Sequence, residues 1–395
     1  MICACGAWKG GLLNLPGIYI HVPFCSAKCP YCDFYSLVGR EKTDAYCAAV
    51  TDELKTLRRT GPFADDLKHR AISTVYFGGG TPSFLGAEKL AALLRAVKEN
   101  FNVAPGAEIT AECNPSSSLA PGFFETLIEA GFNRISMGMQ SAVDAERKKL
   151  GRKATAADVA AAVKACQQAG INNISLDIML GVPEQTDGSL LSSLDFALSL
   201  GVTHLSAYML SIEPGTFFAK MRDVLNLPDE DAVCDRYLSM CDHLQKRGLR
   251  HYEISNFCLP GFEARHNTAY WRDEEYLGIG PAAHSFLNGR RFYFPRDLDA
   301  FIAGSPPVDD GPGGGWEEAV MLALRLDTGI SIQETRENYG VAPSLSLSAV
   351  LQKYKTAGLL TFDGDRITLT EKGFLVSNTV IGEIIEGMIP RSADQ

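Results

Sequence analysis

An alternation of strand and helix repeats about six times along the first two thirds of the chain, and it restricts the fold more than any other feature. The expected strands are residues 18–22, 74–77, 108–112, 134–139, 173–180 and 204–210. Helical periodicity covers 43–59, 87–98, 122–130, 156–169, 189–200 and 230–247. Strands that alternate with helices form parallel sheets with right-handed crossovers. Because six units are too few for an eight-stranded barrel, the sequence predicts an α/β fold with an open, partial (β/α)6 barrel.

The pattern changes after residue 250, which predicts a second domain. Residues from about 251 to 303 are rich in His, Arg and aromatic residues and are expected to be irregular. A Pro/Gly-rich linker is predicted at 304–315. Helical patterns and one hairpin within 316–395 then predict a small winged-helix-like α+β domain. The barrel would therefore span 17–303, preceded by a flexible Gly-rich extension at 1–16.

Charge and composition exclude several classes of function. The net charge of −10 and pI near 5.3 argue against a nucleic-acid-binding surface, and residues 316–395 are acidic as well. No run approaches the roughly 18 consecutive apolar residues of a membrane span. Because the N-terminus lacks the apolar core of a signal peptide, we expect a cytoplasmic location and free thiols for most of the 11 cysteines.

Three cysteines form the chemically most informative motif. Cys25, Cys29 and Cys32 follow the first strand in a C-x3-C-x2-C pattern. Three thiolates are one too few for a closed zinc site or a closed iron–sulfur cluster. A zinc site would lack its fourth ligand, because the chain has no second C-x2-C, and a Cys29–Cys32 redox pair would leave Cys25 without a role. A 4Fe-4S cluster with one iron left open to a small molecule is the third interpretation.

The motif, with Tyr31 before its last cysteine, resembles the signature of the radical S-adenosylmethionine (SAM) superfamily. Further landmarks occur in order: YIHVPFC, FGGGTPS, ECNP, RISMGMQS, GVPEQT, EPGT and GIGPAAHS. Together they are similar to the branch that contains oxygen-independent coproporphyrinogen III oxidase and the HemW-type heme chaperones. The resemblance covers most of the chain, and it implies that residues 316–395 are a domain of the HemN C-terminal type.

This resemblance implies the cofactors and the residues that hold them. Cys25, Cys29 and Cys32 would ligate three irons of a 4Fe-4S cluster, and SAM would chelate the fourth. Implied SAM contacts are Tyr19, Tyr31, Gly79, Gly80, Thr81, Glu112, Gln140, Arg152 and Asp177. The two glycines would let the backbone approach the ligand closely. The chemistry implied is reductive cleavage of SAM to a 5′-deoxyadenosyl radical, which the cofactors supply and the protein positions.

Two features distinguish between the close relatives. The oxidases extend the cysteine motif to C-x3-C-x2-C-x-C, whereas this chain has Phe34 at the last position. The segment from His266 to Trp271 matches the H-N-x-x-Y-W motif of the chaperones, which is associated with heme. Imidazole can ligate heme iron and aromatic rings can pack on a porphyrin, so His266, Asn267, Tyr270 and Trp271 are the expected heme contacts. In the alternative interpretation, His266 caps a turn and the aromatic residues fill the core.

The sequence thus favours a radical-SAM-type heme chaperone that passes heme to an acceptor, such as a membrane-associated respiratory protein. Coproporphyrinogen oxidase activity, or radical chemistry on another substrate, remains an alternative. The sequence does not decide which residue is the axial ligand of the heme iron. His21, His251 and His284 are further candidates, and a cysteine is another alternative.

Overall fold

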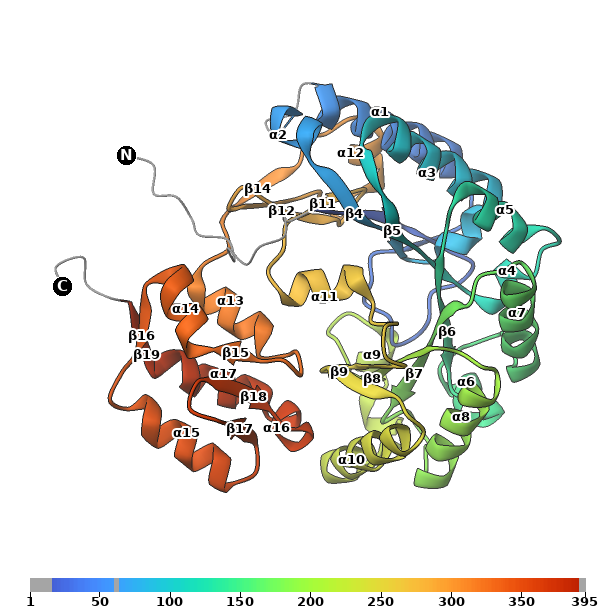
Figure 1. Cartoon of the computed structure of the whole chain (residues 1–395). Coiled ribbons are helices and arrows are strands. Elements are labelled where there is room, and N and C mark those ends of the chain that lie inside the picture. The colour runs from blue at the N-terminus through green and yellow to red at the C-terminus, as the bar shows by residue number, and fades with distance from the viewer. Residues whose placement is uncertain (1–15, 60–63, 391–395) are drawn as a thin grey trace.

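The computed structural model describes residues 16–59 and 64–390, so the expected N-terminal extension lies almost wholly outside the described residues. Helices surround a curved sheet that does not close into a barrel, and the C-terminal domain lies beside its open edge (Figure 1). The predicted open α/β barrel with a separate C-terminal domain is thereby confirmed. Among the described helices, none is long and apolar enough to span a membrane.

One sheet of twelve strands forms the barrel wall, in the order β14-β13-β12-β11-β1-β4-β5-β6-β7-β8-β10-β9. Its parallel part is β11 (Tyr276–Ile279), β1 (Gly17–Val22), β4 (Ala71–Gly79), β5 (Asn102–Cys113), β6 (Arg134–Gln140), β7 (Asn173–Leu180) and β8 (His204–Met209). The long helices are α1 (Thr43–Arg59), α3 (Ala87–Asn100), α5 (Phe123–Ala130), α7 (Ala156–Gln168), α8 (Asp187–Ser199) and α10 (Glu230–Lys246). Figure 1 shows these helices on the outer side of the sheet.

The segment expected to be irregular is instead largely regular, and that prediction is wrong. It contains β9 (Arg250–Glu253), β10 (Asn256–Cys258), α11 (Arg265–Trp271), β11, β12 (His284–Leu287), β13 (Arg290–Tyr293) and α12 (Leu298–Ile302). The expected linker at 304–315 likewise contributes β14 (Val308–Pro312), which pairs with β13. These strands have three to five residues, too few for a two-residue alternation to be recognised, and pairing at the edges of the sheet stabilises them.

Strand β6 illustrates why the sheet is polar on one face and apolar on the other. Successive side chains of a strand point to opposite faces. Its odd-numbered residues Ile135, Met137 and Met139 are fully buried in the hydrophobic core. Its even-numbered residues, from Arg134 to Gln140, line a cavity on the inner face. The period-two pattern therefore places the polar residues of this strand inside the barrel.

The C-terminal domain combines helices with a small sheet, in the order β15-β18-β17. Its elements are α13 (Trp316–Ala323), β15 (Ile330–Ser331), α14 (Ile332–Tyr339), β16 (Val341–Pro343), α15 (Leu347–Thr356), β17 (Leu360–Phe362), β18 (Arg366–Leu369), α16 (Glu371–Leu375), α17 (Ser377–Glu386) and β19 (Met388–Pro390). The domain docks on β9 through backbone hydrogen bonds, from Ile254 to Arg325 (3.0 Å) and from Asp327 to Tyr252 (3.0 Å).

Short elements connect the strands to the outer helices. They are β2 (Phe24–Cys25), β3 (Leu37–Val38), α2 (Ala64–His69), α4 (Pro115–Ser118), α6 (Asp144–Lys149) and α9 (Phe217–Lys220), with 3-10 turns at Pro82–Leu85 and Arg222–Val224. Most lie near the carboxyl ends of the parallel strands, where functional loops gather in folds of this type.

Candidate functional site

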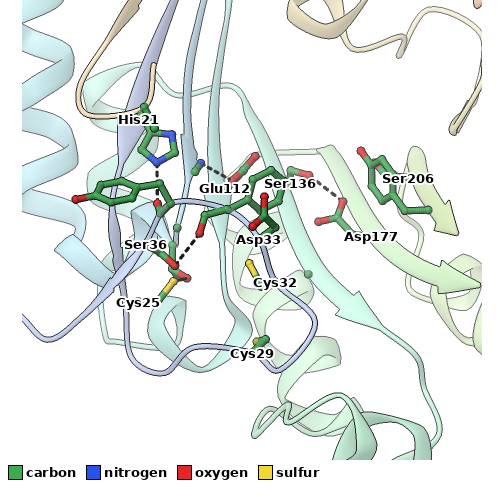
Figure 2. Close-up of a pocket in the computed structure, with 18 of the residues that line it drawn as sticks. His21, Cys25, Cys29, Cys32, Asp33, Ser36, Glu112, Ser136, Asp177 and Ser206 are labelled. Carbon is green, nitrogen blue, oxygen red and sulfur yellow. Dashed lines mark hydrogen bonds between the residues drawn. The ribbon is translucent and has the colours of Figure 1, made fainter. Parts of the chain in front are cut away.

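A cavity of about 1050 Å³ lies on the inner face of the sheet, at the carboxyl ends of its parallel strands. Typical small-molecule pockets hold roughly 300–1,000 Å³, so this one has room for a large ligand. The three cysteines lie on one loop at its edge, with Glu112, Ser136, Asp177 and Ser206 along the strands beside them (Figure 2). All twelve residues predicted to hold the cluster and SAM line this single cavity.

The cysteine loop runs from β2 to β3, and these two short strands pair in parallel. The amide of Leu37 donates to the carbonyl oxygen of Pro23 (2.7 Å), which closes the base of the loop. Cys25, Cys29 and Cys32 are free and half-buried. A guanidinium nitrogen of Arg152 lies 4.0 Å from the sulfur of Cys29, where its charge would stabilise a thiolate.

The spacing of the three sulfur atoms is unsuited to a single zinc ion. Zn–S bonds of about 2.3 Å in tetrahedral geometry place sulfur ligands roughly 3.8 Å apart. Among the described residues, only Cys241, His251 and Glu371 bring three potential ligand atoms within 4.8 Å of one another. The three sulfurs of the cysteine loop are therefore more widely spaced than this. A wider spacing suits a cluster of several irons. The donor set therefore fits a 4Fe-4S cluster that leaves one iron without a protein ligand.

The glycine-rich loop after β4 packs directly on the strand that leads into the cysteine loop. The amides of Gly80 and Thr81 donate to the carbonyl oxygens of Val22 and Phe24 (2.8 Å each). A Cβ on Gly80 would lie 2.9 Å from the Val22 oxygen and 2.8 Å from the Phe24 oxygen. Glycine at this position is therefore required by contact between two backbone segments, whereas the sequence suggested contact with a ligand. Thr81 also places its hydroxyl 3.3 Å from the sulfur of Cys25.

Glu112, at the end of β5, is held by two donors. Its carboxylate accepts hydrogen bonds from the Tyr76 hydroxyl (2.7 Å) and from the Gly79 amide (3.2 Å). Burial nevertheless raises the pKa of Glu112 from 4.5 to about 7. Tyr19 stacks on Tyr76, with ring centroids 6.1 Å apart, and completes this wall. A carboxyl group of this kind can accept hydrogen bonds from ligand hydroxyls or pair with a ligand cation.

We expect Glu112→Gln to flatten the pH dependence of stability of the ligand-free protein. Because the native pKa is raised, native Glu112 keeps a proton that the unfolded chain releases, so stability falls as pH rises from 4.5 through 7. At about 1.4 kcal/mol per pKa unit, and discounted for partial exposure, the loss is about 2 kcal/mol. Asp177, whose pKa burial raises to about 6, and Glu253 and Asp273, whose pKa values burial raises to about 7, leave a residual slope in the variant.

Thermal unfolding between pH 5 and 8 measures this effect. The matched control is Glu125→Gln, on the exposed surface of α5, which should keep the wild-type slope. Equal slopes in wild type and Glu112→Gln would contradict the assignment of the effect to Glu112.

The opposite wall is built from the ends of β6 and β7. Gln140 has a left-handed backbone (φ 68°) at a register shift in the β6–β7 ladder, and it lines the cavity. Strained conformations of this kind cluster at functional sites. Arg152 donates to the carbonyl oxygen of Gly138 (2.8 Å), and Asp177 accepts from the Ser136 hydroxyl (3.2 Å). At this end of the cavity Tyr31 packs on Phe218, with ring centroids 6.3 Å apart.

The residues of the predicted heme motif lie in two different environments in the structure. Asn267 and Tyr270 line the cavity, whereas His266 and Trp271 are not among its lining residues. His266 is 2% exposed, and its two ring nitrogens contact the hydroxyls of Thr74 (2.7 Å) and Tyr270 (2.8 Å). Burial lowers the pKa of His266 to about 3. In this arrangement neither nitrogen is free to ligate iron, which favours the packing role considered as the alternative.

Other candidate ligands differ in their access to the cavity. His251 packs on Phe257, with ring centroids 4.1 Å apart, inside the hydrophobic core. His21 lines the cavity, but its ring nitrogens contact the Tyr19 hydroxyl (3.0 Å) and the Tyr35 carbonyl oxygen (2.9 Å). His284 also lines the cavity and is exposed.

The polar residues of the inner face that the sequence did not predict include Tyr76, Arg134, Ser136 and Ser206. Arg134 is only 2% exposed and lies in the electrostatic field of Glu108 and Asp177. The sequence does contain a signal for these residues, because polar residues at every second position of an otherwise apolar strand mark the inner face of the sheet. Recognising it required knowing that this face lines a ligand cavity.

Comparison with known proteins agrees with the geometry. Residues 19–197 match the sequence model of the Radical SAM superfamily, and residues 315–376 match that of the HemN C-terminal domain. The structure of coproporphyrinogen III oxidase (HemN) from Escherichia coli, a radical SAM enzyme, superposes with a TM-score of 0.79 at 21% identity, covering 93% of this chain and 89% of that one. This likeness establishes the fold. The fold and the site together define a radical SAM protein.

Sequence relatives define the family more narrowly. Proteins named heme chaperone HemW are 36% identical in Mycobacterium tuberculosis (95% of this chain and 97% of the relative) and 33% identical in Lactococcus lactis (93% and 96%). The Haemophilus influenzae protein of that name is 38% identical, with 92% and 96% covered. The chain belongs to the HemW family. Membership in the radical SAM superfamily implies a 4Fe-4S cluster and SAM, which together supply one-electron chemistry when bound.

Proposed function

We propose that the chain is a heme chaperone: it binds heme at the cavity and transfers it, unmodified, to an acceptor protein. Cys25, Cys29 and Cys32 would hold the 4Fe-4S cluster, with SAM seated along the inner strand ends. Support comes from the names of relatives that match almost the whole chain and from a cavity large enough for more than the cluster and SAM.

The observation that carries the proposal is an apolar rim at the cavity. Phe34 (68% exposed), Tyr208 (43%) and Met209 (40%) are large exposed side chains, and all three line it. Exposed apolar side chains gathered at a pocket mark a binding surface. Lys28 and Arg296 lie on the same lining. An apolar rim with adjacent cations suits heme, whose macrocycle is apolar and whose two propionates are anionic.

Phe34 also argues against the oxidase alternative. The extended cysteine motif of the oxidases places a thiol where this chain presents an exposed aromatic ring. Because the superposition with the oxidase reflects the fold alone, it does not carry that activity to this chain.

We infer that the acceptor is a heme protein and, more specifically, a membrane-associated respiratory protein reached from the cytoplasm. The support for an acceptor of some kind is the chaperone name shared by the relatives. The membrane association and the cytoplasmic location go further and rest on the resemblance to the family alone.

The proposal is tested with anaerobically reconstituted full-length protein in two parallel assays. In the first, heme is added and the protein is separated by gel filtration; we expect it to retain about one heme per chain. In the second, coproporphyrinogen, SAM and a reductant are added, and chromatography should recover coproporphyrinogen unchanged. Formation of protoporphyrinogen, or elution of all the heme as free ligand, would overturn the proposal.

A further inference from the structure

His284 differs from every other histidine near the cavity in having free ring nitrogens. Among the described residues, no group lies within hydrogen-bond distance of its imidazole, whereas both nitrogens of His21 and both of His266 are engaged. The His284 side chain is exposed and lines the cavity. Its ring stacks on that of Tyr293, with centroids 5.2 Å apart and planes 23° apart.

The turn before His284 is tightly constructed. Ala282 adopts a left-handed backbone (φ 71°), which costs a non-glycine residue roughly 1–3 kcal/mol. Its amide donates to the carbonyl oxygens of Phe294 (3.0 Å) and Pro295 (3.1 Å). Gly278 approaches so closely that a Cβ there would lie 1.9 Å from the carbonyl oxygen of His284. These contacts fix the position of the His284 backbone, from which the imidazole side chain extends.

The surroundings of His284 suit an anionic ligand with an apolar body. The electrostatic field at His284 comes from the Asp310 carboxylate, which does not line the cavity, and from Arg291 and Arg296, which do. The guanidinium of Arg296 is mostly exposed and pairs with Asp33 at a loose 3.7 Å. Asp33 precedes the exposed Phe34 in the chain, so the partner of Arg296 adjoins one residue of the apolar rim. By contrast, Arg291 is already held by both Asp273 and Glu318.

We propose that His284 is the axial ligand of the iron of heme bound in the cavity, with Arg296 pairing with a propionate in place of Asp33. The inference rests on the proposed function, which gives heme as the cargo. Neutral imidazole is the form that ligates iron. Partial desolvation lowers the pKa of His284 below its usual value, which favours the neutral form.

The test is a heme titration of reconstituted protein, followed by absorbance spectroscopy, with wild type, His284→Ala, Arg296→Gln and His69→Ala. His284→Ala should bind heme at least ten-fold more weakly and lose the spectrum of histidine-ligated iron. Added imidazole should restore that spectrum, a rescue that a misfolded variant would not show. Arg296→Gln should keep the wild-type spectrum with affinity reduced a few-fold. His69→Ala changes an exposed side chain outside the cavity and should match wild type.

The outcomes separate the inference from the function on which it rests. If wild type binds heme and His284→Ala keeps the same affinity and spectrum, His284 is not the ligand and the chaperone proposal still stands. Loss of heme without rescue by imidazole would assign His284 a structural role and overturn the inference. If wild type itself binds no heme, the proposed function and the inference both fail.

Discussion

Replacing any one of Cys25, Cys29 and Cys32 with serine is expected to abolish the iron–sulfur cluster, lowering iron from about four atoms per chain almost to zero. The site offers three thiolates from one loop, so each loss leaves two protein ligands for four irons. Serine cannot replace them, because clusters of this type are held by thiolates. Iron and sulfide analysis after anaerobic reconstitution, together with the visible absorbance of the cluster, gives the answer.

A fourth variant, Cys166→Ser, supplies the matched control. Cys166 lies fully buried in α7, with its sulfur 3.7 Å from the carbonyl oxygen of Ile171, and it is not a cavity residue. The new hydroxyl can use the same acceptor, so the expected cost is about 1 kcal/mol of stability with iron content unchanged. Full iron in any of the three loop variants would show that the corresponding cysteine is not a ligand.

Gly80→Ala is the substitution with the second largest expected effect. The added Cβ would lie 2.8–2.9 Å from two backbone oxygens, so either β1 or the glycine-rich loop must shift. Neither segment can move as a flexible side chain does, and we expect a loss of about 2–4 kcal/mol in the free energy of unfolding. Because β1 leads directly into the cysteine loop, cluster occupancy after reconstitution should fall as well.

Gly382→Ala is the same chemical change at a position with space for it. Gly382 lies within α17, and a Cβ there would meet no atom within 4 Å. Alanine stabilises a helix interior by about 1 kcal/mol relative to glycine, so the two variants should shift in opposite directions in urea unfolding. A Gly80→Ala protein as stable as wild type and equally rich in iron would contradict the described packing of the loop.

The sequence predicted six of the seven parallel strands, because these six are six to twelve residues long and are separated by amphipathic helices. The family resemblance also implied that Tyr19, Glu112 and Asp177 belong to one site, and all three line one cavity. The sequence did not predict β9 to β14. These short strands owe their conformation to pairing partners that are distant along the chain or at the sheet edges, and local patterns do not reveal such partners.

The heme motif shows a second limit of pattern reading. A motif identifies which residues belong together but not which atoms are exposed. His266 stacks on Tyr76 (centroids 5.0 Å apart), and the backbone amide before it and its own amide both bond to Glu108. These contacts join α11 to β4 and β5, and neither Tyr76 nor Glu108 adjoins the motif in the sequence. Only the three-dimensional arrangement separates a buried imidazole from the accessible one of His284.

The central claim is that this chain carries heme to another protein, and transfer is its most direct test. Heme-loaded protein would be mixed with membrane vesicles that contain a heme-free b-type cytochrome, and cytochrome absorbance would be followed with time. The account predicts that intact heme reaches the cytochrome at a rate that rises with vesicle concentration and exceeds the rate for free heme. Heme that stays on the chain, or that arrives no faster than free heme, would contradict it.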